Sequence, residues 1–255
     1  MLAIVTQPET TMCGRYVITT PVQAMAALFG FDGPLLNLKP RYNVAPTQGV
    51  PIIRPTPFGP TKGARELGFV RWGLVPSWAK EVATKPLINA RGETVADKSA
   101  FKSAFLRRRC LVPADGFYEW RRVAGEKPAP HYIYPTDASP MALGGIWEHW
   151  LGADGSEIES MAIVTIQANR TIADLHHRMP VILDPADWAL WLAGTVDEAL
   201  PLIRPAPEDR LTVHAVSRAV NGVAEDSKAL IRPLDGTPSA GEESALPQEG
   251  QLSLF

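Results

Sequence analysis

Short apolar runs, rather than long helical stretches, dominate the hydrophobic pattern of this 255-residue chain. Each run is rich in β-branched or aromatic residues and is bounded by Gly, Pro or Asp, which is typical of strands. The runs are VPIIRP (50–55), LGFVRWGLV (67–75), RCLVPADGFYEW (109–120), HYIYP (131–135), MALGGIW (141–147), MAIVTIQ (161–167), RMPVIL (178–183) and LTVHAVS (211–217). The pattern therefore predicts a chain built mainly from strands.

Helical signals are fewer. The sequence predicts a helix from Thr20-Pro21 to Gly30, because a capping hydroxyl precedes proline at the first helical position and glycine stands at the end. The same logic predicts a helix from Asp184-Pro185 to Gly194, and apolar residues at helical spacing predict a third over Lys98–Arg109. Strands are not regularly interleaved with helices, so we expect the fold class α+β, as a single, mainly antiparallel domain.

Composition narrows the class of protein further. The chain is 45% hydrophobic, which suffices for one substantial core, and no apolar run reaches the roughly 18–20 residues of a membrane span. The leader MLAIVTQPETT (1–11) has neither a basic start nor a long apolar stretch, so it is not a secretory signal. Cys13 and Cys110 are the two cysteines, and they form no disulfide framework, which predicts a reducing, cytoplasmic location without membrane contact.

Charge is distributed unevenly along the chain. Residues 233–255 are polar and acidic, with four acidic residues and no Lys or Arg, and we predict that they are disordered. The chain carries −2 overall and the leader one glutamate, so residues 12–232 carry +3. A mildly basic body is compatible with a local nucleic-acid-binding patch but does not require one.

The stretch TTMCGRYV (11–18) places Met12 directly before Cys13. If translation starts at Met12 and that methionine is removed, Cys13 carries both a thiol and an α-amine. The alternative is that Cys13 is a small buried hydrophobic residue. Gly14 allows close backbone approach and Arg15 supplies a fixed positive charge, which favours the functional interpretation.

Two further stretches concentrate polar groups where strands should end. In LINARGET (87–94), Asn89 and Arg91 point the same way in extended backbone and suit a phosphate or sugar. They could equally be a loop amide and a surface arginine. In DGFYEW (115–120), Glu119 stands between aromatic residues that would raise its pKa for general acid–base work. An outward-facing glutamate is the alternative.

The stretch LHHRMP (175–180) contains paired histidines. They lack the HxxxH or CxxC spacing of a metal site, so we expect no metal. A proton-shuttling histidine beside Arg178 is the better interpretation. Trp72 and Trp78 could stack on bases or lie in the core. No phosphate-binding loop or dinucleotide fingerprint is present, and we expect no cofactor.

Seven motifs occur in a specific order: MCGRY, RYNVAPTQ, WGLVPSWAK, LINARGET, RCLVPADGFYEW, LHHRMPVIL and VSRAVN. Together they resemble the SOS-response-associated peptidase family, also called abasic site processing proteins, over roughly residues 12–232. The resemblance implies a compact α+β domain around a curved, mainly antiparallel β core, with a positively charged groove for single-stranded DNA. In that family the initiator methionine is removed and the exposed cysteine bonds covalently to abasic DNA.

Site residues follow from this resemblance by position. Four match catalytic residues: Cys13 the nucleophile, Asn89 the holder of the opened sugar, Glu119 the catalytic glutamate and His176 the catalytic histidine. Five match DNA-contacting or strand-splaying residues: Arg15, Pro46, Trp78, Arg91 and Arg178. The chain departs from relatives at His177, which is often aspartate, and at Ala79, where some relatives have a second tryptophan.

The implied chemistry joins an aldehyde to an N-terminal cysteine. The amine forms an imine with the ring-opened abasic sugar, and the thiol then closes a five-membered thiazolidine, with slow β-elimination as a side reaction. The leader must be absent, either because translation begins at Met12 or because Cys13 cleaves the bond before it. Two alternatives remain: an N-terminal-nucleophile amidohydrolase, and a non-enzymatic DNA-binding module.

The C-terminal residues QLSLF (251–255) are apolar again. They resemble the pentapeptide with which bacterial repair proteins bind the DNA polymerase sliding clamp. That resemblance implies a polar contact by Gln251 and apolar contacts by Leu252, Leu254 and Phe255. The alternative is that the terminus docks on its own domain. The predicted partners are therefore single-stranded DNA containing abasic sites and the sliding clamp.

Overall fold

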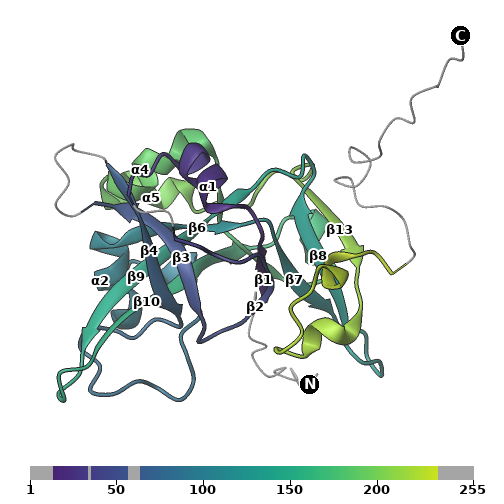
Figure 1. Ribbon diagram of the computed structural model, residues 1–255, viewed down its shortest axis with the longest axis horizontal. Helices are drawn as coiled ribbons and strands as arrows, with labels where there is room; N and C mark the ends of the chain where they lie inside the picture. The colour runs from purple at the N-terminus through teal and green to yellow at the C-terminus, as the bar shows by residue number, and fades with distance from the viewer. Residues whose placement is uncertain (1–13, 34–35, 57–63, 235–255) are drawn as a thin grey trace, which may run out of the picture.

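The computed structural model describes residues 14–33, 36–56 and 64–234. The predicted leader, Cys13 and the clamp motif lie outside the described residues. Two β-sheets form the body of the molecule, and a group of helices covers one end of the larger sheet (Figure 1).

The larger sheet closes into a small barrel. Its ring runs β10 (Glu157–Gln167), β4 (Arg65–Trp72), β3 (Gly49–Pro55), β6 (Arg109–Ala114), β9 (Met141–Leu151) and back to β10. Three short strands extend it: β5 (Asn89–Arg91), β11 (Arg178–Pro180) and β12 (Ile182–Leu183). Among these described strands, β10 pairs in parallel with β4 and β5, and the remaining pairings are antiparallel. The expected α+β fold with a curved, mainly antiparallel core is confirmed.

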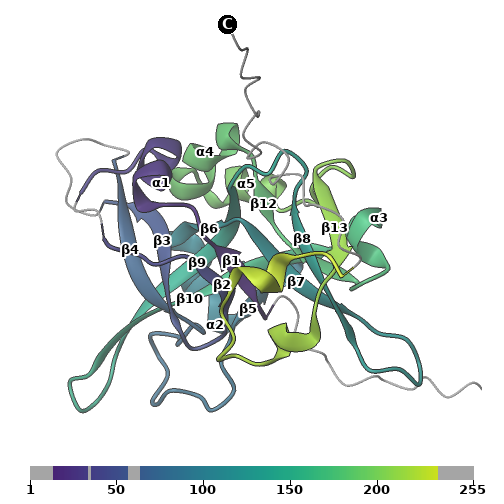
Figure 2. The ribbon, with the colours of Figure 1, turned by 45° about the vertical axis from the view of Figure 1, so that its right-hand side comes forward.

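The smaller sheet lies beside the barrel (Figure 2). Its order is β13 (Leu211–Ala215), β8 (Ala129–Pro135), β7 (Gly116–Arg121), β1 (Tyr16–Ile18) and β2 (Arg41–Val44). The chain passes between the sheets four times, from β2 to β3, from β6 to β7, from β8 to β9 and from β12 to β13. The predicted strand over 109–120 is therefore two strands, which divide at Asp115. Strands β1, β2 and β5 were not predicted as separate strands, because three or four residues carry too little periodicity.

All three predicted helices are present. They are α1 (Val22–Phe29), α2 (Ser99–Arg107), and the 3₁₀ turn η2 (Pro185–Asp187) that leads into α4 (Trp188–Ala193). Short helices and turns complete the set: α3 (Arg170–Ala173), α5 (Val196–Ala199), η1 (Gly92–Thr94), η3 (Leu200–Leu202), η4 (Arg218–Asn221) and η5 (Lys228–Ile231). Figure 1 shows α1, α4 and α5 together at one end of the barrel, where Phe29 stacks on Trp188 at a ring-centroid distance of 4.8 Å.

The predicted start of the first helix needs a correction. Pro21 is the N-cap rather than the first helical residue, and no side chain caps the helix. The Thr20 hydroxyl instead donates to a carboxylate oxygen of Asp115, whose other oxygen accepts the Thr20 N–H at 2.9 Å. Asp115, at the crossing from β6 to β7, thus fixes the beginning of α1.

The main core fills the barrel and continues under the helices. Its largest fully buried side chains include Trp72, Trp191, Phe105 and Phe117. A second, smaller cluster lies in the other sheet around Tyr118, Tyr132, Tyr134, Val216 and Val220. Within the part of the chain that the structure describes, no helix is long and apolar enough to cross a membrane.

Candidate active site

Strand β5 presents the asparagine and arginine of the LINARGET motif. It pairs in parallel with β10, with Asn89 beside Ile163 and Arg91 beside Thr165. Ala90 between them is fully buried, whereas Asn89 is half-buried and Arg91 exposed. The two polar side chains therefore share the face that points away from the core, as alternation in extended backbone predicts.

The other edge of β10 carries the LHHRMP motif. Strand β11 runs antiparallel to β10, with Arg178 opposite Gln167. The Arg178 guanidinium donates to both carboxylate oxygens of Glu93, each at 2.8 Å, and to the Thr165 carbonyl at 2.6 Å. Hydrogen bonds from Arg178 hold the pKa of Glu93 below its usual value. The two motifs thus meet across the end of β10.

Close packing explains the glycine in LINARGET. Gly92 follows Arg91 and begins the turn η1. A Cβ atom at this position would lie 2.3 Å from Cγ2 of Ile203 and 3.2 Å from the Thr165 carbonyl oxygen. A side chain at this position would therefore force Ile203 or the turn to shift.

His176 lies in the connection between α3 and β11 and is 9% exposed. Its Nδ1 accepts the backbone N–H of Arg178 at 3.2 Å, so in the neutral ring the proton is on Nε2. That nitrogen is buried and has no hydrogen-bond partner among the described residues. Burial, and next the charge of His177, lower the pKa of His176 to about 4. A neutral imidazole therefore offers an unused N–H donor at pH 7.

This buried ring predicts a specific dependence of stability on pH. Above pH 6.5 His176 is neutral in both the folded and unfolded states. Between pH 6.5 and about 4 only the unfolded chain binds the proton, so the free energy of unfolding falls as pH falls. From pH 7 to pH 4.5 we expect wild type to lose about 2 kcal/mol more than His176→Gln. Urea unfolding at both pH values checks this, and equal losses in the two proteins would contradict it.

Glu119 is 3% exposed and lies on β7, opposite His131 of β8. The neighbouring strand β1 pairs Tyr16 with Phe117, and the Tyr118 N–H donates to the Arg15 carbonyl at 3.0 Å. This pairing extends to Arg15 and Tyr118, the residues next to Gly14 and Glu119 in the sequence. The glutamate is therefore on an inward position, not on the outward face that was the alternative.

An aromatic contact joins this part of the site to β5. Tyr16 packs edge-on against Trp72 with ring centroids 5.3 Å apart, and the Trp72 indole donates to the Ile88 carbonyl at 3.0 Å. Ile88 directly precedes Asn89. Trp72 is fully buried, so it serves the core and not base stacking. The positive charge of Arg122, just after β7, also contributes to the lowered pKa of His176.

The remaining predicted DNA contacts differ in their surroundings. Pro46 is half-buried in the turn between β2 and β3, where the Thr47 N–H donates to the Trp72 carbonyl at 2.7 Å. Trp78 is 63% exposed, and its indole donates to the Ser99 carbonyl at the start of α2. Arg15 donates to the Asn43 side chain and to the carbonyls of residues 220 and 221.

Sequence reasoning missed several residues of this region. Glu93 lies inside a quoted motif, and its opposite charge to Arg178 was the available signal. Asn43 lies inside RYNVAPTQ, but nothing in the sequence indicates its distant partners. Within the described residues, no group of three or more His, Cys, Asp or Glu side chains could hold a metal ion.

Comparison with known proteins identifies the class of protein to which this fold and these residues belong. Residues 12–223 match the family described as SOS response associated peptidase (SRAP). The chain is 34% identical over 227 residues to Abasic site processing protein YoqW of Bacillus subtilis, which covers 86% of this chain and 99% of YoqW. The chain therefore belongs to the SRAP family.

Other comparisons agree with this assignment. Abasic site processing protein HMCES of Gallus gallus is 31% identical over 239 residues, covering 81% of this chain and 70% of that protein. A crystal structure of a Bordetella bronchiseptica protein matches with a TM-score of 0.68 and 26% identity, covering 80% of this chain and 100% of that one. One from Bacteroides thetaiotaomicron has a TM-score of 0.77 at 24% identity, covering 87% and 99%, and shows likeness of fold alone.

Proposed function

We propose that this protein processes abasic sites in single-stranded DNA by capturing them covalently, with Cys13 as the N-terminal residue. The names of the relatives YoqW and HMCES support abasic sites as the substrate class. The observation that carries the proposal is the pairing of β1 with β7. It brings Arg15, two residues after Cys13, beside Tyr118, the residue that precedes the buried Glu119.

The reaction needs an aldehyde, a primary amine and a thiol. An abasic sugar in its ring-opened form supplies the aldehyde. The Cys13 amine, with an ordinary pKa of about 8, is partly neutral at pH 7 and adds to the carbonyl carbon. Loss of one water gives an imine, the thiol sulfur then bonds to the imine carbon, and the thiol proton passes to nitrogen. The net change is the loss of one water and the closure of a thiazolidine.

Three side chains have roles in this scheme. Glu119 moves protons at the amine and at the departing water. The Nε2–H of His176 donates to the sugar ring oxygen and favours opening to the aldehyde. DNA phosphates would raise the pKa of His176 by favouring its charged form, so DNA binding and proton transfer are coupled. Asn89 hydrogen-bonds the hydroxyl released by ring opening.

Arg91 is proposed to contact a phosphate beside the lesion, because it is exposed on the same face as Asn89. Arg91→Ala should weaken binding to single-stranded DNA and reduce the slope of log affinity against log salt by about 0.7–1. Fluorescence anisotropy over a salt series measures both. Arg204→Ala, which removes a surface ion pair with Asp187, is the matched control and should keep the wild-type slope. An unchanged slope in Arg91→Ala would make Arg91 a structural residue.

The proposal is tested by mixing the native protein with a single-stranded oligonucleotide that carries one abasic site. A heat-stable adduct whose intact mass equals protein plus DNA minus one water supports it. Intact mass of the free protein must show an N-terminus at Cys13. If no adduct forms and the protein instead turns over amide substrates, the N-terminal-nucleophile amidohydrolase is the correct function. β-Elimination is expected as a slow side reaction that cleaves the DNA strand.

The clamp interaction is a proposal from the sequence alone. In it, residues 233–250 tether the domain and QLSLF (251–255) anchors it. Tethering would raise the local concentration of the domain at single-stranded gaps.

A further inference from the structure

Asn43 of β2 is a fully buried polar residue with no catalytic or DNA-contacting role in the scheme above. Its Oδ1 accepts a hydrogen bond from Nη1 of Arg15 at 2.9 Å. Its Nδ2 donates to the backbone carbonyls of Val220 at 3.2 Å, Gly222 at 3.0 Å and Glu225 at 2.7 Å. Its hydrogen-bonding groups are thus all engaged, and they tie β2 to a segment more than 170 residues later.

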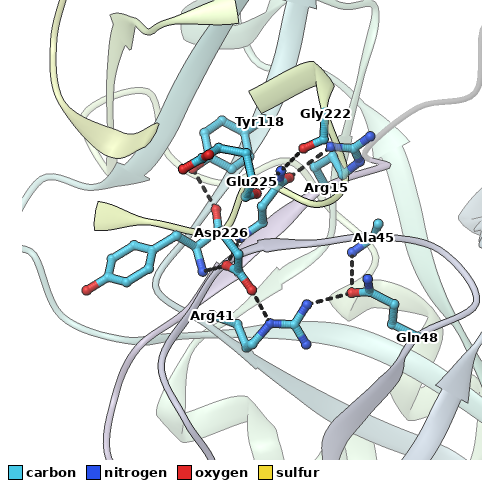
Figure 3. Close-up of polar contacts among 10 residues, drawn as sticks. Arg15, Arg41, Ala45, Gln48, Tyr118, Gly222, Glu225 and Asp226 are labelled. Carbon is cyan, nitrogen blue, oxygen red and sulfur yellow. Dashed lines mark hydrogen bonds and ion pairs between the residues drawn. The ribbon is translucent and has the colours of Figure 1, made fainter. Parts of the chain in front are cut away.

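Asp226 holds the same segment from its other end (Figure 3). One carboxylate oxygen accepts the backbone N–H groups of Tyr42 and Asn43, the latter at 2.8 Å. The other accepts Nε of Arg41, whose Nη2 donates to Gln48 at 2.8 Å. Charge-assisted hydrogen bonds of this kind are stronger than neutral ones. The segment 220–226 is therefore fastened to β2 at both ends.

This fastened segment provides the acceptors for Arg15. Nη1 of Arg15 donates to the Val220 carbonyl at 2.6 Å, and Nη2 donates to the Asn221 carbonyl at 3.3 Å. The Asn221 side chain in turn accepts the indole N–H of Trp120 at 2.8 Å, on the strand that carries Glu119. The guanidinium of Arg15, two residues after Cys13, thus donates three hydrogen bonds to other parts of the protein.

We infer that Asn43 and Asp226 are positioning residues: they hold the 220–226 segment so that Arg15 fixes the backbone leading to Cys13 beside Glu119. This inference rests on the proposed function. In it, Arg15 acts through geometry as well as through any phosphate contact. Lysine cannot replace it, because an ammonium group lacks the planar fork that binds two carbonyls and an amide oxygen together.

Arg15→Lys and Asp226→Asn test the inference. Two quantities are measured: the single-turnover rate of adduct formation at saturating abasic DNA, and the affinity for unmodified single-stranded DNA over a salt series. We expect the rate to fall at least about tenfold in both variants, since small misplacements of reacting groups cost up to about a hundredfold. The affinity for unmodified single-stranded DNA should differ from wild type by less than twofold, and the slope of log affinity against log salt should equal that of wild type. Arg204→Lys, at a surface ion pair, should match wild type in both.

The outcomes separate the possible failures. If wild type forms adducts and Arg15→Lys forms them at the wild-type rate, the positioning inference is overturned and the proposed function stands. A lower salt slope in Arg15→Met, with full activity in Arg15→Lys, would make Arg15 a phosphate contact only. If Asp226→Asn shows no cooperative thermal unfolding, that variant is not folded, and the rate of Arg15→Lys alone decides whether the positioning inference holds. If wild type forms no adduct, the proposed function fails and the inference falls with it.

Discussion

Cys13→Ala should abolish covalent capture of abasic single-stranded DNA while leaving salt-sensitive binding in place. Alanine keeps an α-amine, so an imine can still form, but no thiol remains to close the ring. Imines hydrolyse, whereas a thiazolidine survives heat. Denaturing electrophoresis after heating should therefore show no adduct for the variant and a strong adduct for wild type. A heat-stable adduct in Cys13→Ala would exclude the thiazolidine mechanism.

Two controls sharpen this experiment. Cys110→Ala removes the other thiol, which is fully buried in β6, and burial raises the pKa of that thiol far above neutral pH. The Cys110 thiol is thus neither accessible nor ionised, and its removal should leave adduct formation at the wild-type rate. Borohydride reduction of the Cys13→Ala reaction should trap the imine and show that the amine still reaches the lesion.

The same chemistry predicts the effect of the leader. Protein that retains residues 1–12 has no free amine on Cys13 and can form only a labile hemithioacetal. It should give no heat-stable adduct. Mass spectrometry of the products decides the matter, because a thiazolidine-linked product that still carries the leader would be incompatible with the mechanism.

Glu119→Gln should slow adduct formation by about 10²–10⁴-fold, the usual contribution of a general acid–base group. The side chain is 3% exposed and glutamine is nearly isosteric, so the variant keeps the shape of the side chain and loses its capacity for proton transfer. Binding to unmodified DNA should remain within twofold of wild type. Single-turnover rates at saturating DNA provide the measurement.

The matched control is Glu159→Gln on β10. Glu159 pairs with Arg54 at 2.7 Å on the barrel and has no role in the proposed chemistry. The Glu159→Gln variant should form the adduct with abasic DNA at the wild-type rate. If Glu119→Gln also reacts within twofold of wild type, Glu119 is not a catalytic residue and another group must move the protons.

The sequence by itself determined the longer strands and helices of this protein and its family. Runs such as MAIVTIQ carry enough β-branched residues to specify a strand locally, and Phe101 and Phe105 mark the buried face of α2 through helical spacing. The order of seven motifs indicated the SRAP family. The reactivity proposed for Cys13 also rests on the sequence, because it depends on the covalent structure of an N-terminal cysteine.

Only the tertiary structure decided which distant segments meet. Periodicity shows which face of an element is buried, but it does not show what covers that face. The pairing of β5 with β10 and the contacts of Asn43 with 220–225 therefore had no local signature. The opposite charges of Glu93 and Arg178 were visible in the sequence, but only the fold shows that the two residues pair. The neutral state of His176 also depends on the tertiary structure, since its lowered pKa arises from burial and neighbouring charge that exist only after folding.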